Sequence, residues 1–252
     1  MRRHVLTSKA FDIKCIHITS RNGQYDERYA SDALKQVLHN PDTTLSDRRC
    51  RIIKSDKTTT VGEIEIDDRR CIVKRYNTKN LIHAARRLFQ RSRAENCWIQ
   101  AHALSKIGVA VAPPIGWIQE KHLGLKTRSW LISEFVHGNH CQLILEKHPQ
   151  SALSVIPLVA EMLVKLWNSD CSHGDLKATN IICTDDGPVL IDLDATCQHW
   201  YQFLAQQRIR RDLRRFLHNW QDNPFVQQQA ISELRSAMTK VSWNTQRVDK
   251  IM

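Results

Sequence analysis

The stretch SHGDLKATNII, residues 172–182, decides the fold and carries the strongest chemical signal in the chain. Asp175 is followed five positions later by Asn180, and a second acid, Asp192, follows the apolar residues 189–191. Phosphoryl transfer from a nucleotide needs one carboxylate to orient and deprotonate the attacking hydroxyl, and a carboxamide with a second carboxylate to hold Mg²⁺ against the phosphates. The three residues therefore predict a phosphoryl-transfer site.

A lysine on an upstream β-hairpin completes this set. Residues 58–66 and 71–76 alternate apolar and polar side chains, contain many β-branched residues and flank a polar turn at Asp67-Asp68, which is typical of a hairpin. Lys74 lies in the second of these strands. Taken alone, Lys74 would be interpreted as a solvated lysine on a strand. It is assigned to phosphate binding only because Asp175, Asn180 and Asp192 follow it in the order that such a site requires.

The remaining pattern separates a β-rich part from an α-rich part. Further strands are expected over residues 52–53, 115–119 and 130–135, so the antiparallel sheet has about five strands. Helices are expected over residues 24–39, 80–106, 152–168, 199–220 and 224–241. The sequence therefore predicts an α+β fold with an N-terminal helical extension over residues 1–45, an N-lobe over residues 46–136 and a mostly helical C-lobe over residues 137–252.

Composition limits the class of protein. The 252 residues carry a formal net charge of +11, which favours an anionic partner. The eight cysteines include no CxxC pair, and the N-terminus lacks the apolar core of a signal peptide, so we expect reduced thiols in a cytosolic protein. The apolar stretches are too short to span a bilayer, which leaves a soluble or peripheral protein.

The motifs resemble the protein-kinase-like superfamily, because residues 173–180 are similar to its catalytic loop and residues 191–194 to its metal-binding motif. A narrower resemblance is to the bacterial lipopolysaccharide core kinases that phosphorylate Kdo or heptose. It rests on ordered blocks between about residue 54 and residue 220: TTTVGEIEIDDRRCIVKRYN, RSRAENCW, HALSKIGVAVAPPIGW, ISEFVHG, SHGDLKATNII, PVLIDLDA and RRDLRRFLHNW.

This resemblance implies a two-lobed protein-kinase-like fold, with a small antiparallel sheet and one long helix in the N-lobe, that uses ATP and Mg²⁺. It makes Asp175 the catalytic base and places Lys177 beside the γ-phosphate, where its charge would stabilise the transition state. Asn180 and Asp192 become the Mg²⁺ ligands, and Asp194 a residue that assists the metal.

The resemblance also implies a nucleotide site in the N-lobe. Lys74 would contact the α- and β-phosphates, and Glu95 is the candidate ion-pair partner of Lys74, with a plain surface role as the alternative. The connector at residues 133–136, which includes Glu134 and Val136, would present backbone groups to adenine.

Two features depart from the kinase pattern or need a structural role. The expected nucleotide-covering loop, residues 54–60, has no glycine, so its phosphate contacts would come from backbone N–H groups and threonine hydroxyls. His173 is interpreted as a structural hydrogen-bonding residue that holds the catalytic loop, and Asp212, within RRDLRR, as a local ion-pair partner of its neighbours.

The acceptor is expected to be small or a carbohydrate, because only about fourteen residues separate Asp194 from the basic helix that begins near Arg208. That spacing leaves no room for the long activation segment on which protein kinases bind a peptide. Two basic clusters could hold anionic sugars or membrane phosphates, with solvated helix faces as the alternative. They are Arg208, Arg211 and Arg215 on one helix, and Arg86, Arg87, Arg91 and Arg93 on another.

The predicted function is therefore ATP-dependent phosphorylation of a Kdo or heptose hydroxyl. The predicted partner is an anionic lipopolysaccharide core or lipid-linked sugar, with the inner-membrane surface as a further candidate. Two alternatives stay open: a kinase of soluble molecules similar to aminoglycoside or choline kinases, and a catalytically weak pseudokinase in envelope biogenesis. No motif predicts a nucleic-acid partner, and no protein partner is identified. The predicted location is the cytoplasm, with the inner face of the inner membrane as a candidate peripheral site.

Overall fold

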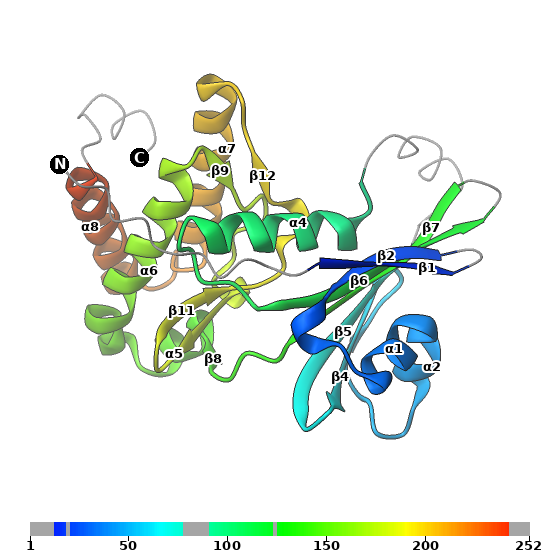
Figure 1. The fold of residues 1–252 in the computed structure, drawn as a ribbon. Helices are drawn as coiled ribbons and strands as arrows, with labels where there is room; N and C mark the ends of the chain where they lie inside the picture. The colour runs from blue at the N-terminus through cyan, green and yellow to red at the C-terminus, as the bar shows by residue number, and fades with distance from the viewer. Residues whose placement is uncertain (1–12, 19–20, 78–90, 123–124, 242–252) are drawn as a thin grey trace. The chain divides into compact units, whose positions relative to one another are not determined.

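The computed structural model describes residues 13–18, 21–77, 91–122 and 125–241 (Figure 1). The chain divides into two units. The first unit comprises Met1–Trp98 and Pro113–Phe135, and the second comprises Ile99–Ala112 and Val136–Met252. Residues 99–112 are part of the second unit, and the predicted lobe bounds, 46–136 and 137–252, stay a prediction.

The first unit is built on a seven-stranded antiparallel sheet with the order β1-β2-β6-β7-β5-β4-β3. Its strands are β1 (Ile13–Ile18), β2 (Arg21–Asp26), β3 (Arg51–Ser55), β4 (Thr59–Ile66), β5 (Arg69–Tyr76), β6 (Pro114–His122) and β7 (Leu125–Glu134). The predicted hairpin is the pair β4–β5. Asp67 and Asp68 both have positive φ, 50° and 59°, as a two-residue hairpin turn of the kind that matches strand twist requires.

Two short helices complete the first unit, α1 (Asp32–His39) and α2 (Pro41–Ser46), after the 3₁₀ turn η1 (Glu27–Tyr29). Leu34, Leu38 and Leu45 from these helices are buried in one cluster with strand residues such as Val73 and Ile132. Helix α2 comes so close to the sheet that a Cβ on Gly62 would lie 2.9 Å from a Leu45 methyl carbon. The glycine in β4 therefore serves packing.

The N-terminal segment differs from the expected helical extension. The structure has α1 beginning at Asp32, because residues 21–26 form β2 and pair with β6 from Arg21↔Glu120 to Tyr25↔Gly116. Strands β1 and β2 raise the sheet from about five expected strands to seven. The helix expected over residues 80–106 is present as α4 (Arg93–Lys106), and its earlier part, with Arg86 and Arg87, lies outside the described residues.

The second unit is mainly helical. It contains α5 (Cys141–Lys147), α6 (Ala152–Asn168), α7 (Gln202–His218) and α8 (Pro224–Lys240), with the short 3₁₀ turns η2 (Pro149–Ser151), η3 (Ala178–Asn180) and η4 (Leu193–Ala195). Helix α6 packs against α8, and α7 packs against both α8 and β9 (Figure 1). Trp167, Phe216 and Leu234 are among the buried side chains of these helices.

Two small sheets carry the loops of the second unit. β10 (Ile181–Thr184) pairs with β11 (Gly187–Leu190) and with β8 (Asn139–His140), and β9 (Cys171–Ser172) pairs with β12 (Cys197–Gln198). The catalytic-loop motif thus lies between β9 and β10, and the second acidic motif directly after β11. All eight cysteines are free thiols in the structure.

One helical segment of the described residues, Pro149–Asn168, is long and apolar enough to cross a membrane by length and composition. Half of the qualifying stretch is buried within the protein. A buried core helix meets the same criterion, and α6 fits that description.

Candidate active site

The backbone of the catalytic loop is set by one glycine. Gly174 has φ +85°, and a Cβ there would lie 2.5 Å from the carbonyl oxygen of Ala195. Both the left-handed conformation and the close approach exclude a side chain at this position. The chain can therefore turn sharply between the buried His173 and the half-buried Asp175.

A buried aspartate from α7 anchors this turn. The Oδ2 atom of Asp212 accepts a hydrogen bond from the His173 N–H at 2.6 Å, and Oδ1 accepts one from the Gly174 N–H at 2.9 Å. Asp212 is 1% exposed, and burial raises its pKa above the usual range. The interpretation of Asp212 as a local ion-pair partner is thus corrected: it holds the catalytic loop from 38 residues away in sequence.

His173 links the loop to the second acidic motif. Its Nε2 atom lies 3.0 Å from the Ile191 carbonyl oxygen, so Nε2 donates, and its own carbonyl accepts from the Thr196 hydroxyl at 3.3 Å. The side chain is fully buried. These contacts are those of a structural hydrogen-bonding residue, as the sequence predicts.

The carboxylate of Asp175 lies between two cations. Oδ2 is 2.9 Å from the Lys177 ammonium nitrogen, and Oδ1 is 2.7 Å from Nε of Arg215. The Asp175 side chain is 38% exposed, so solvent or an acceptor can reach it. The sequence places Arg215 in a basic cluster for anionic sugars or membrane phosphates, and not beside the carboxylate of Asp175. The position of Arg215 in the basic helix, one turn after Arg211, was the only signal in the sequence.

Asn180 and Asp192 are brought together by the register of the β10–β11 hairpin. Ile181 pairs with Leu190, and the Ile191 N–H donates to the Asn180 carbonyl at 3.0 Å, so Asn180 and Asp192 flank the same end of the hairpin. The Asn180 side-chain N–H₂ donates to the Asp175 carbonyl at 2.9 Å, which leaves its carboxamide oxygen as a ligand. Asp192 adopts a left-handed conformation with φ 61°, an unusual state for a residue other than glycine and one often found at functional sites.

The donor set fits Mg²⁺. Carboxylate and carboxamide oxygens are hard ligands, and Mg²⁺ is commonly held by one or two carboxylates together with substrate phosphates. Among the residues that the structure describes, no three His, Cys, Asp or Glu side chains are grouped closely enough to form a complete metal cage. Asp194 lies on η4, two residues after Asp192, and is half-buried.

In the first unit, Lys74 lies in the middle of the sheet. It pairs with Val61 of β4 and Leu131 of β7. Its ammonium nitrogen lies 4.9 Å from the centroid of the Tyr76 ring, a cation–π distance. The Tyr76 hydroxyl in turn lies 3.3 Å from Sγ of Cys97 in α4, so the lysine is half-buried beside a fixed aromatic side chain.

Glu95 makes a local contact at the start of α4. Its Oε2 atom accepts from the Ser92 N–H at 3.4 Å, and the Glu95 N–H donates to the Ser92 hydroxyl at 3.1 Å. This reciprocal pair is a capping box, which satisfies the free N–H groups at a helix start. Pairing of Glu95 with Lys74 stays a prediction.

The connector residues use their backbone groups unequally. The N–H groups of Glu134 and Phe135 donate to Pro113 and Arg70, both at 2.9 Å. In the described part of the chain the Val136 N–H makes no hydrogen bond, so it is the one of these three that can donate to adenine. The Glu134 carboxylate accepts from the Tyr29 hydroxyl at 2.8 Å. Burial and this hydrogen bond raise the Tyr29 pKa well above its usual range.

The loop at residues 54–60 is closed by a carboxylate. Asp56 Oδ1 accepts from the N–H groups of Thr58 and Thr59 at 2.7 and 2.9 Å, and from the Thr58 hydroxyl at 2.7 Å. These hydrogen bonds, with the Lys54 ammonium, hold the pKa of Asp56 well below its usual range. Two of the N–H groups and one of the hydroxyls expected to contact nucleotide phosphates are therefore already occupied by a negatively charged side chain.

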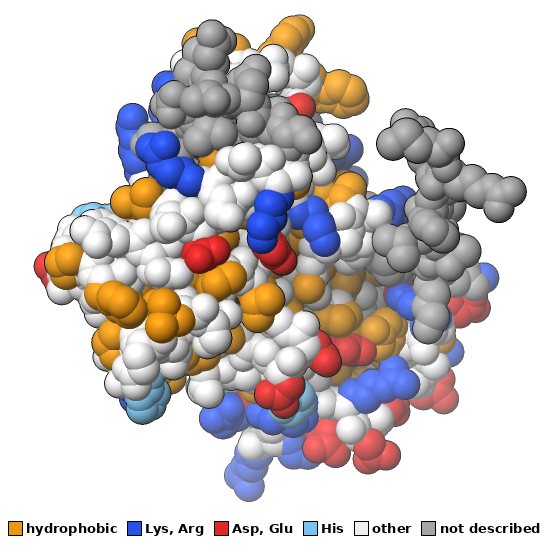
Figure 2. All heavy atoms as spheres, turned by 90° about the vertical axis from the view of Figure 1, so that its left-hand side faces the viewer, with side chains coloured by type: hydrophobic (Ala, Val, Ile, Leu, Met, Phe, Trp, Pro, Cys, Tyr) orange, Lys and Arg blue, Asp and Glu red, His pale blue; other side chains and the backbone are white. Residues whose placement is uncertain are grey.

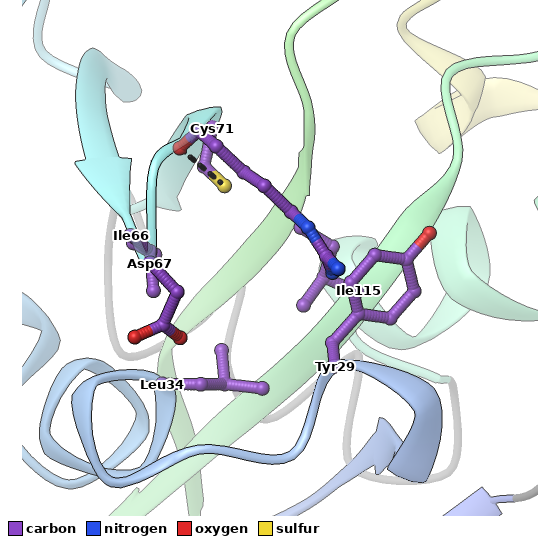
Figure 3. Close-up of a pocket in the computed structure, with 7 residues that line it drawn as sticks. Tyr29, Leu34, Ile66, Asp67, Cys71 and Ile115 are labelled. Atoms are coloured by element: carbon purple, nitrogen blue, oxygen red, sulfur yellow. Dashed lines mark hydrogen bonds between the residues drawn. The ribbon is translucent and has the colours of Figure 1, made fainter.

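A pocket in the first unit lies apart from these residues. Figure 3 shows Tyr29 and Leu34, from η1 and α1, facing Ile66 and Asp67 at the β4–β5 turn. Cys71 and Ile115 also line it, and its walls are mostly apolar. None of the predicted site residues is among its lining residues, so it is a feature of the packing between the N-terminal helices and the sheet.

Comparison with known proteins places this geometry in a family. The model of the lipopolysaccharide kinase (Kdo/WaaP) family matches residues 46–237. No curated protein sequence compared with the chain matches it. A solved structure described as WaaP in complex with acyl carrier protein is similar with a TM-score of 0.54 and 13% identity, over 88% of this chain and 97% of that one.

The structural match confirms the predicted kinase-like α+β fold. At 13% identity it shows the fold alone. The family match spans most of the chain, including the catalytic loop and the hairpin with Lys74, and supports a phosphotransferase that uses ATP. The family match, the fold and the resemblance predicted from the sequence all agree. The chain belongs to the Kdo/WaaP family of lipopolysaccharide kinases.

Proposed function

We propose that the chain transfers the γ-phosphoryl group of ATP to a hydroxyl of Kdo or heptose in the lipopolysaccharide core, with Asp175 as the general base. The observation that carries the proposal is the Asp175 carboxylate. It is partly exposed. The two residues before it, His173 and Gly174, are held by hydrogen bonds from their N–H groups to the buried Asp212. A base that works on a large acceptor must be both accessible and fixed in position.

The proposed reaction needs one proton transfer. The acceptor hydroxyl oxygen bonds to the γ-phosphorus while the bond from that phosphorus to the bridging oxygen of ADP breaks, and the hydroxyl proton passes to the Asp175 carboxylate. Arg215 and Lys177 each pair with one oxygen of this carboxylate. The two ion pairs orient the carboxylate, and Lys177 is close enough in sequence and space to neutralise charge on the transferred group.

The remaining roles follow from the site geometry and the family. Asn180 and Asp192 would hold Mg²⁺, with Asp194 assisting, and the metal would neutralise charge on the phosphates. Lys74 would contact the α- and β-phosphates, Val136 would donate its free N–H to adenine, and Glu134 would form part of the same connector. Glu95 would position Lys74 through the carboxylate oxygen that the capping box does not use.

One observation favours a second candidate, the pseudokinase. Asp56 occupies the N–H groups of the loop that would cover the phosphates, and its charge opposes a triphosphate. The complete set of Lys74, Asp175, Asn180 and Asp192 supports catalysis instead. A soluble acceptor is the other alternative, and the acceptor assay separates it from the lipid-linked one.

The test is transfer of labelled γ-phosphate from ATP to dephosphorylated lipopolysaccharide core. We expect Mg²⁺-dependent labelling of the sugar by the native chain. Asp175→Asn should lower kcat by about 10²- to 10⁴-fold, as expected for loss of a general base, while calorimetry shows Mg²⁺-dependent ATP binding close to that of the native chain. Asp222→Asn, at an exposed turn after α7, is the matched control.

Three outcomes contradict the proposal in different ways. Unchanged turnover in Asp175→Asn removes the base assignment. Labelling of soluble amino alcohols or aminoglycosides, but not of the core, would show that the acceptor is a soluble small molecule. ATP binding with no transfer to any acceptor supports the pseudokinase.

A further inference from the structure

The start of α7 carries an exposed group of large apolar side chains. Trp200 is 97% exposed, Tyr201 72%, Phe203 67% and Leu204 45%. We call these four residues the apolar tip. The first three are the most exposed large hydrophobic side chains of the part that the structure describes. In Figure 1 the start of α7 lies at the top of the view, above α6 and α8, and Figure 2, with the same vertical direction, shows hydrophobic side chains projecting at its top.

The core of the second unit does not need the apolar tip. Helix α7 buries its inner face through Ala205, Ile209, Leu213 and Phe216, all at most 1% exposed. A periodic buried face of this kind already accounts for the packing of the helix. Exposure of several adjacent large apolar side chains costs free energy in water, and contiguous patches of this kind mark interaction surfaces.

Arginines follow the tip along the helix. Leu204, Arg208, Arg211 and Arg215 recur at intervals of four, three and four residues, so they lie on one face. Arg214 is also exposed. In the described part of the chain, no carboxylate pairs with Arg208, Arg211 or Arg214, and we call these three residues the free arginines. They form a positively charged flank next to the apolar tip.

The same face ends at the catalytic base, because Arg215 pairs with Asp175 at 2.7 Å. At a rise of about 1.5 Å per residue, the eleven steps along the helix from Leu204 to Arg215 span about 16 Å. If the tip contacts a membrane surface, a sugar linked to a lipid in that membrane could therefore reach Asp175. The face connects the tip, the free arginines and the base in that order.

We infer that the apolar tip and the free arginines bind the surface of an anionic lipid bilayer. Tryptophan and tyrosine favour the headgroup region, where their rings are partly in an apolar and partly in a polar environment, and phenylalanine and leucine enter the acyl boundary. Arginines beside them pair with lipid phosphates. The inference deepens the proposed function and rests on it in one respect: membrane binding brings Asp175 to an acceptor that is itself held in the membrane.

The test is co-sedimentation of the full chain with vesicles of phosphatidylcholine, with and without phosphatidylglycerol, in the absence of ATP. We expect binding that requires the anionic lipid and weakens with salt. The double variant Trp200→Ser with Phe203→Ser should bind at least about tenfold more weakly. Arg208→Gln with Arg211→Gln should lose most of the dependence on phosphatidylglycerol.

A matched control is the double variant Leu153→Ser with Phe225→Ser, two exposed apolar residues on α6 and α8 at 61% and 47% exposure. It should bind vesicles as the native chain does. Thermal unfolding of all variants shows which of them are folded, so that a loss of binding is not mistaken for a loss of folding. If the tip variant does not fold, tryptophan fluorescence of the native chain and of Trp200→Phe provides the second readout. Because the chain has seven tryptophans, the contribution of Trp200 is the difference: the blue shift on vesicle addition should be smaller in Trp200→Phe.

Several results overturn the inference. They are a native chain that does not bind anionic vesicles, equal binding by the tip and control variants, or a tip that instead mediates self-association or binding of acyl carrier protein. Because vesicle binding is measured without ATP, it separates from the proposed function. Binding without phosphoryl transfer refutes the proposed function alone, and transfer without binding refutes this inference alone.

Discussion

The catalytic loop at residues 172–180 and the hairpin loop at residues 54–60 are held in different ways. Hydrogen bonds that fix the catalytic loop come from Asp212 and Ile191, which are 18 to 39 residues away in sequence, and they are largely buried. In the hairpin loop the hydrogen bonds run from Asp56 to residues two or three positions away, at the surface.

This difference has an energetic consequence. A buried N–H that loses its acceptor carries a desolvation cost of about 1–3 kcal/mol, because water cannot replace the lost partner. At an exposed turn, water replaces the partner and the net effect is small. Substitutions at the catalytic loop should therefore strongly affect both stability and turnover. Substitutions at the hairpin loop should mainly affect nucleotide affinity, and only modestly.

Among substitutions of the residues that hold the two loops, the largest effect is expected for Asp212→Ala. The change removes the acceptor of both the His173 and Gly174 N–H groups, so the free energy of unfolding should fall by about 1–3 kcal/mol for each N–H left unpaired. Because these N–H groups flank Asp175, kcat should fall by at least about tenfold, a rough figure for a misplaced base, while KM for ATP changes little. Denaturant unfolding and steady-state kinetics measure the two effects.

Asp212→Asn sharpens this comparison, because it keeps one acceptor oxygen and should fall between the native chain and the alanine variant. The control is Asp222→Ala at an exposed turn, which should alter neither quantity. An Asp212→Ala variant with native stability and native kcat would show that Asp212 does not position the loop.

A smaller effect is expected for Asp56→Asn. The carboxamide oxygen can still accept from the N–H groups of Thr58 and Thr59, so the turn is kept while one negative charge is lost. If residues 54–60 cover the nucleotide phosphates, KM for ATP should fall by about two- to fivefold, because a negative charge that repels the phosphates is removed. Initial rates at varied ATP concentration measure the change.

The matched control for this prediction is Asp47→Asn. Asp47 closes an exposed turn of the same unit by accepting from the Arg49 N–H at 2.8 Å, but no motif links that turn to a nucleotide. An equal change of KM in both variants, or none in Asp56→Asn, would contradict a role of the hairpin loop at the phosphates.

The same contrast explains how far the sequence predicts the structure. Local patterns are predicted well: the β4–β5 hairpin follows from strict alternation around Asp67-Asp68, and α6 from its helical apolar spacing, with both ends at the expected residues 152 and 168. The site motifs are also local, because Asp175, Lys177 and Asn180 lie within six residues. Asp192 joins them through the two-stranded pairing of a short hairpin.

Long-range features are predicted poorly. Strand β2, with the sequence RNGQYD, has no alternation of apolar residues, and it becomes a strand only because β6 provides hydrogen-bond partners. Asp212 lies among arginines, which suggests a local ion pair, and its real partners are 38 and 39 residues away. In both cases the deciding interaction comes from a segment that no local pattern identifies.

The smallest expected effect concerns His199, whose Nε2 atom lies 2.8 Å from the Ser172 hydroxyl next to the catalytic loop. Burial, and then the charge of Arg208, lower the pKa of His199 below its ordinary 6.5. Below about pH 6.5 the unfolded chain therefore takes up a proton that the folded chain does not yet bind. The free energy of unfolding should fall as the pH is lowered through this range, and level off below the folded-state pKa.

His199→Gln isolates this contribution, because glutamine can still form a hydrogen bond with Ser172 but has no charge to gain. Between about pH 7.5 and pH 5.5 the native Tm should fall by roughly 1–3 °C more than that of the variant. The difference is small because His199 is partly exposed and solvent screens its charge. His148→Gln, at an exposed position, should retain the native pH dependence. Parallel curves for the native chain and His199→Gln would show that His199 does not contribute to the pH dependence, and that the environment beside the catalytic loop does not shift its protonation.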